Sequence, residues 1–257
     1  MDKKVILISI DGMRPDGLAQ CGNPYVEELK KIGSYAMDAR TVFPSVTLPC
    51  HMSMFHSVNP DRHGTTTNTY MPPVRPFNGL FEQIKNAGGE SAIFYGWEQI
   101  RDVARPGSLN HAVYIGAYTY DHTDGLLTDA ALRYIQDKEP DFVFLYMVET
   151  DDKGGHDSGW MTETYLEYLS TAINNAKRVI EACGDRYTVI ITADHGGHDR
   201  THGTMMDEDM TIPMMFVGEP FEPGRALENV SMLDLTPTIA KILNVPAVKE
   251  WEGKALV

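Results

Sequence analysis

The stretch 187–203, YTVIITADHGGHDRTHG, holds the densest group of side chains that could do chemistry. Its apolar, β-branched run Val189–Thr192 is typical of a strand buried on both faces, and the run ends at Asp194 and His195. Such a strand would deliver a carboxylate and an imidazole to the carboxyl edge of a sheet, where ligands bind in open α/β folds. Both groups are good ligands for a divalent transition metal such as zinc. The alternative is that Asp194 caps a helix and that the histidines are ordinary loop residues.

Two further apolar runs also end in acidic residues. The run at 4–10 is followed directly by Asp11, and the run at 141–148 is followed by an acidic segment that contains Asp152. His156 comes four residues after Asp152, with two glycines between them. We therefore expect a turn that lets both side chains reach one ion.

Together these strand ends supply two sets of three nitrogen and oxygen ligands. The first set is Asp152, His156 and His202, and the second is Asp11, Asp194 and His195. If the register of the acidic segment differs by one residue, Asp151 takes the place of Asp152. Two ions about 3.5–4 Å apart would form a two-metal hydrolytic site, with zinc as the expected metal and manganese as the alternative. For any single pair of these Asp and His residues, the alternative is a structural role as a helix cap or a surface ion pair.

Thr47 is the candidate nucleophile. It precedes Leu48 and Pro49 at the start of an expected helix, where free N–H groups and the helix dipole favour a bound phosphate. A threonine hydroxyl is a poor nucleophile unless a metal or a base helps to remove its proton. The alternative is that Thr47 only caps the helix.

The elements that must position these residues alternate between strand and helix patterns. This alternation predicts an α/β fold with a mostly parallel central sheet and helices on both faces. The expected strands are 4–10, 36–43, 91–95, 141–148, 189–192 and 212–217, and the expected helices are 23–33, 51–56, 80–87, 127–138, 162–183 and 233–243. We expect one catalytic domain over 1–257, with small loop excursions near 65–80 and 98–125.

Composition narrows the class of protein. The formal charge of −14 leaves no basic footprint for a nucleic-acid polymer, although metal ions could still attract a small anionic phosphoester. The three cysteines are few and widely spaced, which predicts no disulfide framework and fits a reducing compartment. We find no apolar run long enough to span a membrane and a poor match to a signal peptide, so we expect a cytoplasmic protein that does not engage membranes.

The combination of motifs resembles the alkaline phosphatase superfamily, and within it the nucleotide pyrophosphatase/phosphodiesterase branch. The matching segments, in chain order, are VILISIDGMRPD, VTLPCHMSMFHSVNPDRHG, VETDDKGGHDSG, TADHGGHDRTHG and VSMLDLTPTIAKIL. The resemblance implies a three-layer sandwich with one metal, usually zinc, on Asp152, His156 and His202, and a second on Asp11, Asp194, His195 and Thr47. It also implies that Asn68, a little beyond His63 and Gly64, contacts the phosphate.

Two positions depart from the patterns of related branches. Leu48 stands where this branch usually has an aromatic residue that stacks on a nucleobase, which puts a nucleotide substrate in doubt. Cys50 lacks the proline and arginine that a sulfatase motif requires after it. We therefore expect a two-metal phosphoester hydrolase that cleaves phosphodiester or pyrophosphate bonds through a phospho-threonine intermediate. The alternatives are a phosphomonoesterase or phosphonate hydrolase, for which Arg14 and Lys153 are the nearest candidate cations, and a metal-binding protein without turnover.

Overall fold

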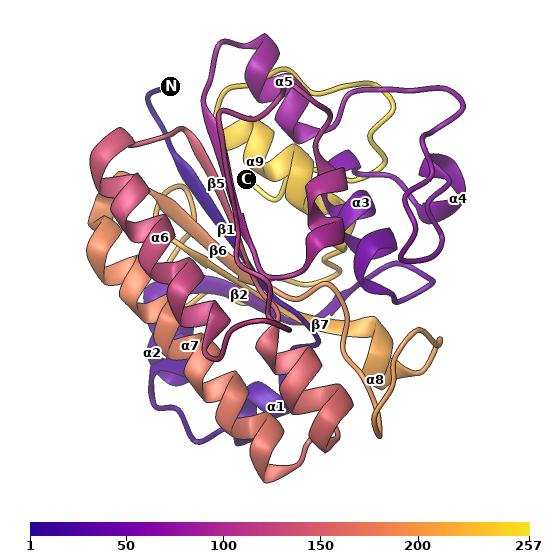
Figure 1. Cartoon of the computed structure of the whole chain (residues 1–257). Helices are drawn as coiled ribbons and strands as arrows, with labels where there is room; N and C mark the ends of the chain where they lie inside the picture. The colour runs from indigo at the N-terminus through magenta and orange to yellow at the C-terminus, as the bar shows by residue number, and fades with distance from the viewer.

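The computed structural model describes all 257 residues and places every strand in one seven-stranded sheet (Figure 1). The strands are β1 (Val5–Ile10), β2 (Gly33–Arg40), β3 (Ser91–Tyr95), β4 (His111–Tyr114), β5 (Phe142–Met147), β6 (Thr188–Thr192) and β7 (Thr211–Val217). Their order is β2-β7-β6-β1-β5-β3-β4. Only β7 runs antiparallel to its neighbours, so the predicted mostly parallel sheet is confirmed.

Helices cover both faces of the sheet, as the α/β pattern predicted (Figure 1). One face carries α1 (Pro15–Gln20), α2 (Tyr25–Ile32), α6 (Thr123–Lys138) and α7 (Glu163–Cys183); the other carries α3 (Thr47–His56), α5 (Leu80–Asn86) and α9 (Leu235–Ile242). The short helices are α4 (Pro60–His63), η1 (Glu98–Val103), η2 (Thr150–Ser158), η3 (Gly184–Arg186), α8 (Asp207–Met210) and η4 (Met232–Asp234). None of the helices has both the length and the hydrophobicity that crossing a bilayer requires.

The central strands β1, β5 and β6 are apolar because both of their faces are covered by helices. Every residue of these strands is buried, and their apolar side chains belong to a hydrophobic cluster of 65 residues. The register aligns Ile10 of β1 with Met147 of β5, and Ser9 of β1 with Thr192 of β6. The three strands therefore end at the same level, and the segments that follow them meet at one edge of the sheet.

The boundaries of three elements differ from those expected. Helix α3 begins at Thr47, two residues before Pro49, which lies in the first turn as expected, where its missing N–H costs no helical hydrogen bond. The excursion expected near 98–125 contains η1 and the four-residue strand β4. The strand is hard to recognise in the sequence because it is short and pairs with β3 alone at the edge of the sheet. Helix α1, with Pro15 as its first residue, lies in a segment where no helix was expected.

Candidate active site

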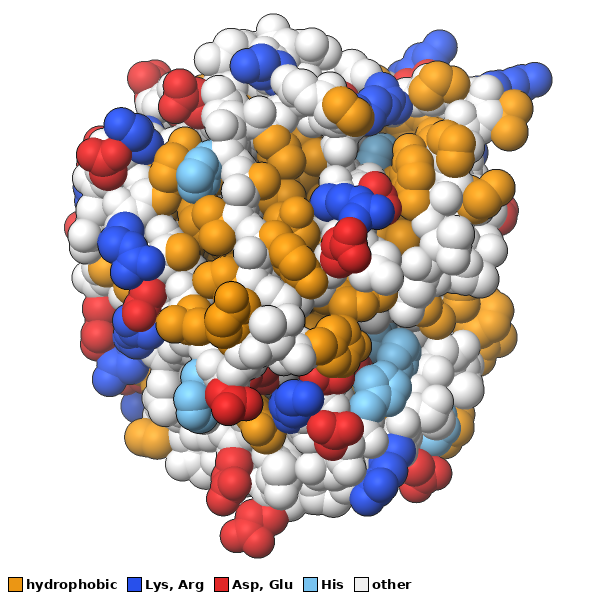
Figure 2. All heavy atoms as spheres, in the orientation of Figure 1, with side chains coloured by type: hydrophobic (Ala, Val, Ile, Leu, Met, Phe, Trp, Pro, Cys, Tyr) orange, Lys and Arg blue, Asp and Glu red, His pale blue; other side chains and the backbone are white.

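The residues with possible chemistry meet in one cavity at the carboxyl edge of the sheet. Asp11 follows β1, η2 follows β5, the loop 193–206 follows β6, and Thr47 begins α3. Figure 2 shows acidic and histidine side chains gathered below the hydrophobic middle of this face. The cavity has a volume of about 100 Å³ and is lined by Asp11, Thr47, Asn68, Trp97, Tyr118, Tyr146, Val148, Asp151, Asp152, His156 and His202.

The first group of potential ligands is the predicted set Asp11, Asp194 and His195. All three side chains are buried, and their donor atoms lie within 4.8 Å of one another. The Nε2 atom of His195 lies 3.4 Å from Asp11 Oδ1 and 3.4 Å from Asp194 Oδ2. The Thr47 hydroxyl oxygen lies 3.1 Å from the same nitrogen. The structure therefore brings the candidate nucleophile and the three predicted ligands together.

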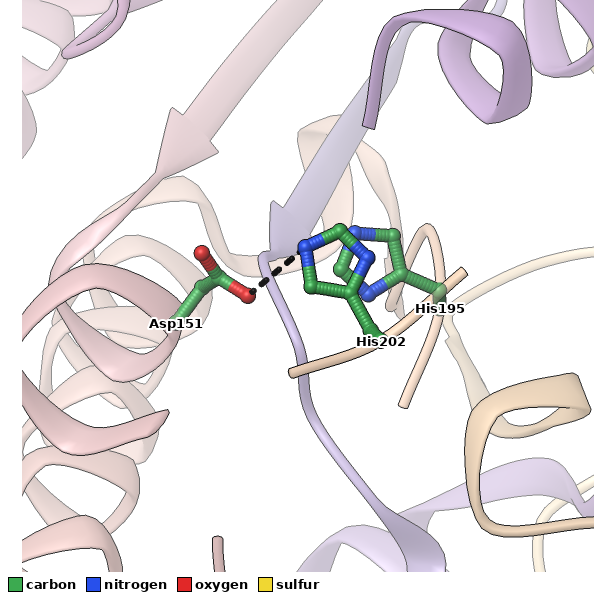
Figure 3. A group of neighbouring side chains, drawn as sticks. All are labelled: Asp151, His195 and His202. Atoms are coloured by element: carbon green, nitrogen blue, oxygen red, sulfur yellow. Dashed lines mark ion pairs between the residues drawn. The ribbon is translucent and has the colours of Figure 1, made fainter. Parts of the chain in front are cut away.

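The second group is centred on Asp151, with His195 and His202 around it (Figure 3). Figure 3 shows the two imidazole rings side by side and facing the Asp151 carboxylate. Asp151 Oδ1 is 3.9 Å from His202 Nε2, and Asp151 Oδ2 is 3.4 Å from His156 Nε2. The predicted histidines are thus in place around this carboxylate.

The carboxylate nearest these histidines is that of Asp151 rather than Asp152, so the geometry favours the alternative register, one residue earlier. The segment forms the π-helix η2, in which residues five apart are bonded along the helix, so Asp151 and His156 share a face. The expected spacing of four residues, between Asp152 and His156, suits a turn with fewer residues than that of a π-helix. Asp152 also borders the cavity, but its carboxylate pairs with Lys153 at 3.2 Å.

The three histidines of the cavity share one arrangement of their ring nitrogens. In each ring Nδ1 lies close to a backbone carbonyl oxygen, so Nδ1 carries the proton and donates it in a hydrogen bond. The carbonyls belong to Gly196 for His195 (2.8 Å), Ser45 for His202 (2.9 Å) and Arg200 for His156 (3.0 Å). The Nε2 lone pairs are therefore left facing the carboxylates, as in histidines that bind a metal. Burial lowers the pKa of His202 to about 3, which keeps that ring neutral.

Three buried carboxylates of the site each have one oxygen atom without a hydrogen-bond partner. Asp11 Oδ1, Asp151 Oδ1 and Asp194 Oδ2 are buried and accept no hydrogen bond. Burial, and then repulsion between the carboxylates, raises the pKa of Asp11 and Asp151 well above the usual range. At Asp194 the effect of burial is outweighed by attraction from His195 and His51, so its pKa lies below the usual value. Divalent cations would satisfy these oxygens and the Nε2 lone pairs, so the residues present suit a pair of metal ions.

Thr47 occupies the first turn of α3 but does not cap it. The N-cap residue is Val46, which leaves the 5%-exposed Thr47 side chain directed at His195. Asn68 Oδ1 accepts a hydrogen bond of 3.0 Å from the Leu48 N–H, so the amide NH₂ of Asn68 remains as a donor beside Thr47. The Leu48 side chain is fully buried and does not reach the cavity.

Three aromatic residues of the cavity were not anticipated from the sequence. Tyr146, on β5, donates a hydrogen bond from its hydroxyl to Asp11 Oδ2. Trp97 and Tyr118 line the cavity and come from the chain between β3 and α6. The sequence there has no regular hydrophobic pattern from which their role could be predicted. The sequence gives one indication only, which is that Tyr118 lies within the loop excursion expected near 98–125. In the same way, Asn68 lies within the excursion expected near 65–80.

Comparisons with known proteins support the predicted family resemblance. Residues 5–88 match the type I phosphodiesterase/nucleotide pyrophosphatase family, and residues 98–247 match the metalloenzyme superfamily. Ectonucleotide pyrophosphatase/phosphodiesterase family member 1 of Rattus norvegicus is 24% identical in an alignment 217 residues long that covers 74% of this chain. The chain spans about a quarter of the length of that relative (24%).

Two solved structures share the fold at low sequence identity. An inactive form of murine ectonucleotide pyrophosphatase/phosphodiesterase 5 in complex with AMP superposes with a TM-score of 0.81, at 16% identity and over 96% of each chain. The phosphonate monoester hydrolase of Silicibacter pomeroyi superposes with a TM-score of 0.79, at 15% identity, over 99% of this chain and 76% of its own. These matches show that this chain belongs to the metalloenzyme superfamily, and the match of residues 5–88 supports the predicted resemblance to the nucleotide pyrophosphatase/phosphodiesterase branch of the alkaline phosphatase superfamily.

Proposed function

We propose that the chain hydrolyses phosphodiester or pyrophosphate bonds and that Thr47 is its nucleophile. The observation that carries the proposal is the Thr47 hydroxyl, which is buried and lies 3.1 Å from His195 Nε2 within the ring of unpaired carboxylates. In this proposal Asp11, Asp194 and His195 hold one divalent ion, and Asp151, His156 and His202 hold the other. The ions would lower the pKa of the hydroxyl and neutralise charge on the attacking and leaving oxygens.

The chain's own residues then account for the two steps of the reaction. The Thr47 oxygen forms a bond to phosphorus while the bond to the leaving oxygen breaks, and the hydroxyl proton is lost. The Asn68 amide and the Thr47 backbone N–H would bind a nonbridging oxygen, since the Leu48 and Cys50 N–H groups are already bonded to Asn68 and Val46. Water then cleaves the phospho-threonine, which restores the hydroxyl and releases the phosphate monoester.

The charges around the cavity favour a diester over a monoester, because a monoester brings an additional negative charge. No lysine or arginine lines the cavity. The Arg14 guanidinium is bound to Asp16 and to the Gly197 carbonyl oxygen, and Lys153 pairs with Asp152 and Asp157. The two candidate cations for a monoesterase or phosphonate hydrolase are therefore already engaged.

The size of the cavity suggests where the leaving group lies. A volume of about 100 Å³ accommodates a phosphoryl group but is well below that of pockets that enclose whole ligands. The remainder of the substrate would therefore extend past Trp97 and Tyr118 at the opening. Because Leu48 is buried, we propose that these two rings, rather than residue 48, contact an aromatic leaving group such as a nucleoside.

The identity of the ions and the compartment are further parts of the proposal. Carboxylate and imidazole donors favour zinc, with manganese as the second choice. Cys21, Cys50 and Cys183 are all free thiols, which supports a reducing compartment such as the cytoplasm.

The test is turnover of bis-p-nitrophenyl phosphate beside p-nitrophenyl phosphate, with zinc or manganese, for the wild type, Thr47→Ala and Thr171→Ala. Thr171 is an exposed threonine on α7 and serves as the matched control. We expect diester preference, a loss of about 10³-fold or more in Thr47→Ala, and no change in Thr171→Ala. Monoester preference would overturn the diester assignment, and full activity in Thr47→Ala would overturn the assignment of Thr47 as the nucleophile.

A further inference from the structure

Trp160 lies between the three segments that carry the candidate metal ligands. Its side chain is 6% exposed. The indole Nε1–H donates a hydrogen bond of 2.9 Å to the Gly12 carbonyl oxygen, next to Asp11. The Trp160 backbone N–H donates a hydrogen bond of 2.8 Å to the Asp199 carbonyl oxygen, in the loop that follows β6. One residue is therefore bonded to the segments after both β1 and β6.

Each of the three segments places a glycine against the indole. A Cβ atom on Gly197 would lie 2.2 Å from a ring atom, and one on Gly155 would lie 2.5 Å away. One on Gly12 would lie 3.1 Å away. Both of the shorter distances are well inside van der Waals contact, so at those positions the backbone itself packs on the ring. The thickness and position of the indole thus set the spacing of the segments.

The ring also contacts two of the candidate ligands directly. The centroids of the Trp160 and His156 rings are 5.3 Å apart at an interplanar angle of 84°. Those of Trp160 and His202 are 6.0 Å apart at 64°. Both are edge-to-face contacts, which favour one orientation of each imidazole.

We propose that Trp160 is a positioning residue for the metal centre, and that it fixes the His156 and His202 rings so that their Nε2 atoms converge on Asp151. This inference rests on the proposed two-metal site. A tryptophan that only filled the core would affect stability without a selective effect on metal affinity. The bonds to Gly12 and Asp199 and the two imidazole contacts instead predict that metal binding itself depends on the indole.

The first experiment measures zinc binding to metal-free wild type, Trp160→Phe and Trp251→Phe by calorimetry. Trp251 is the matched control, since its indole also donates to a backbone carbonyl, that of Asn78, but this carbonyl lies in none of the three segments that carry the candidate ligands. We expect zinc affinity to fall about 10–100-fold at one site in Trp160→Phe, the range for residues that orient metal ligands, and to stay unchanged in Trp251→Phe. Wild-type zinc affinity at both sites in Trp160→Phe would overturn this inference but not the proposed metal centre. A wild type that binds no zinc would instead overturn the proposed metal centre.

A second measurement keeps Trp160 in place, so it does not depend on the folding of Trp160→Phe. In the double variant Trp97→Phe/Trp251→Phe, Trp160 is the one remaining tryptophan. We expect zinc to change its fluorescence with the same midpoint as calorimetry, because the indole edge touches the His156 ring. Zinc bound by calorimetry without any change in emission would contradict the proposed contact.

Discussion

Asp151→Asn and Asp152→Asn form a pair of neighbouring, chemically identical changes that test the register of the metal site. The Asp151 carboxylate faces His156 and His202, and its Oδ1 atom has no hydrogen-bond partner. The Asp152 carboxylate pairs with Lys153, whose side chain is 35% exposed. An asparagine keeps the size of either side chain and removes its charge. Only the change at Asp151 should weaken metal binding strongly.

The expected magnitude follows from binding linkage. A direct ligand should contribute at least the upper end of the roughly 10–100-fold range found for residues that merely orient ligands. At a zinc concentration of about 100 times the wild-type Kd, binding stabilises the wild type by about 2.7 kcal/mol; a hundredfold loss of affinity reduces this to about 0.4 kcal/mol. For a chain of this size, the difference lowers the zinc-induced increase in Tm by roughly 5–9 °C.

Without metal, Asp151→Asn should have the opposite effect and increase thermal stability. Burial and carboxylate repulsion raise the pKa of Asp151, so the unfolded carboxyl ionises more readily than the folded one and neutral pH destabilises the fold. Removing that charge should therefore raise the Tm of the metal-free protein, although it lowers the gain from zinc. Thermal scans of both variants with EDTA and with zinc provide the measurement. A normal zinc response in Asp151→Asn together with a lost response in Asp152→Asn would refute the register.

Two further predictions use residues near the site. Burial and the neighbouring Glu149 raise the pKa of Asp124 to about 8 from an ordinary value of 3.8, so stability should fall as pH rises from about 4 to about 8. Urea unfolding across this range should show the decline in the wild type and a flatter profile in Asp124→Asn; equal slopes would contradict the assignment. Tyr118→Ala should raise KM for an aryl or nucleoside diester about threefold to tenfold with little change in kcat, since stacked rings contribute about 0.5–1.5 kcal/mol. Steady-state kinetics should show no such effect in Tyr120→Ala, an exposed tyrosine two residues away that serves as the control, and an unchanged KM in Tyr118→Ala would exclude the contact.

The sequence was sufficient to predict the parts of the site that depend on strand ends. The apolar runs that end at Asp11 and at Asp194 and His195 predict the central strands. They also predict the edge where these residues meet, because parallel strands in register must end together. The choice between Asp151 and Asp152 could not be settled in the same way. It depends on the wide turn of η2, which forms with glycines at 154 and 155 packed on Tyr165 and Trp160 rather than through a local preference.

Residues whose role depends on long-range packing left no local signal. Trp160 lies outside every predicted ligand pair, and its neighbours Gly12 and Gly197 are 148 and 37 positions away in the chain. Strand β4 carries alternately half-buried and exposed side chains over only four residues, too few to establish a period. Both features become visible only when the chain is folded.

The unpaired carboxylates connect the stability of the fold to its proposed chemistry. Burial and repulsion between carboxylates raise the pKa of Asp11 and Asp151, and each of these two carboxylates has a buried oxygen without a hydrogen-bond partner, which is costly. The hydrophobic cluster behind them keeps these oxygens in place because they follow strands that are fully covered on both faces. The core thus holds the ligands in a geometry that is unfavourable without cations. Cation binding would relieve that repulsion, so the residues that make the metal-free site unfavourable are also those that would bind the ions tightly.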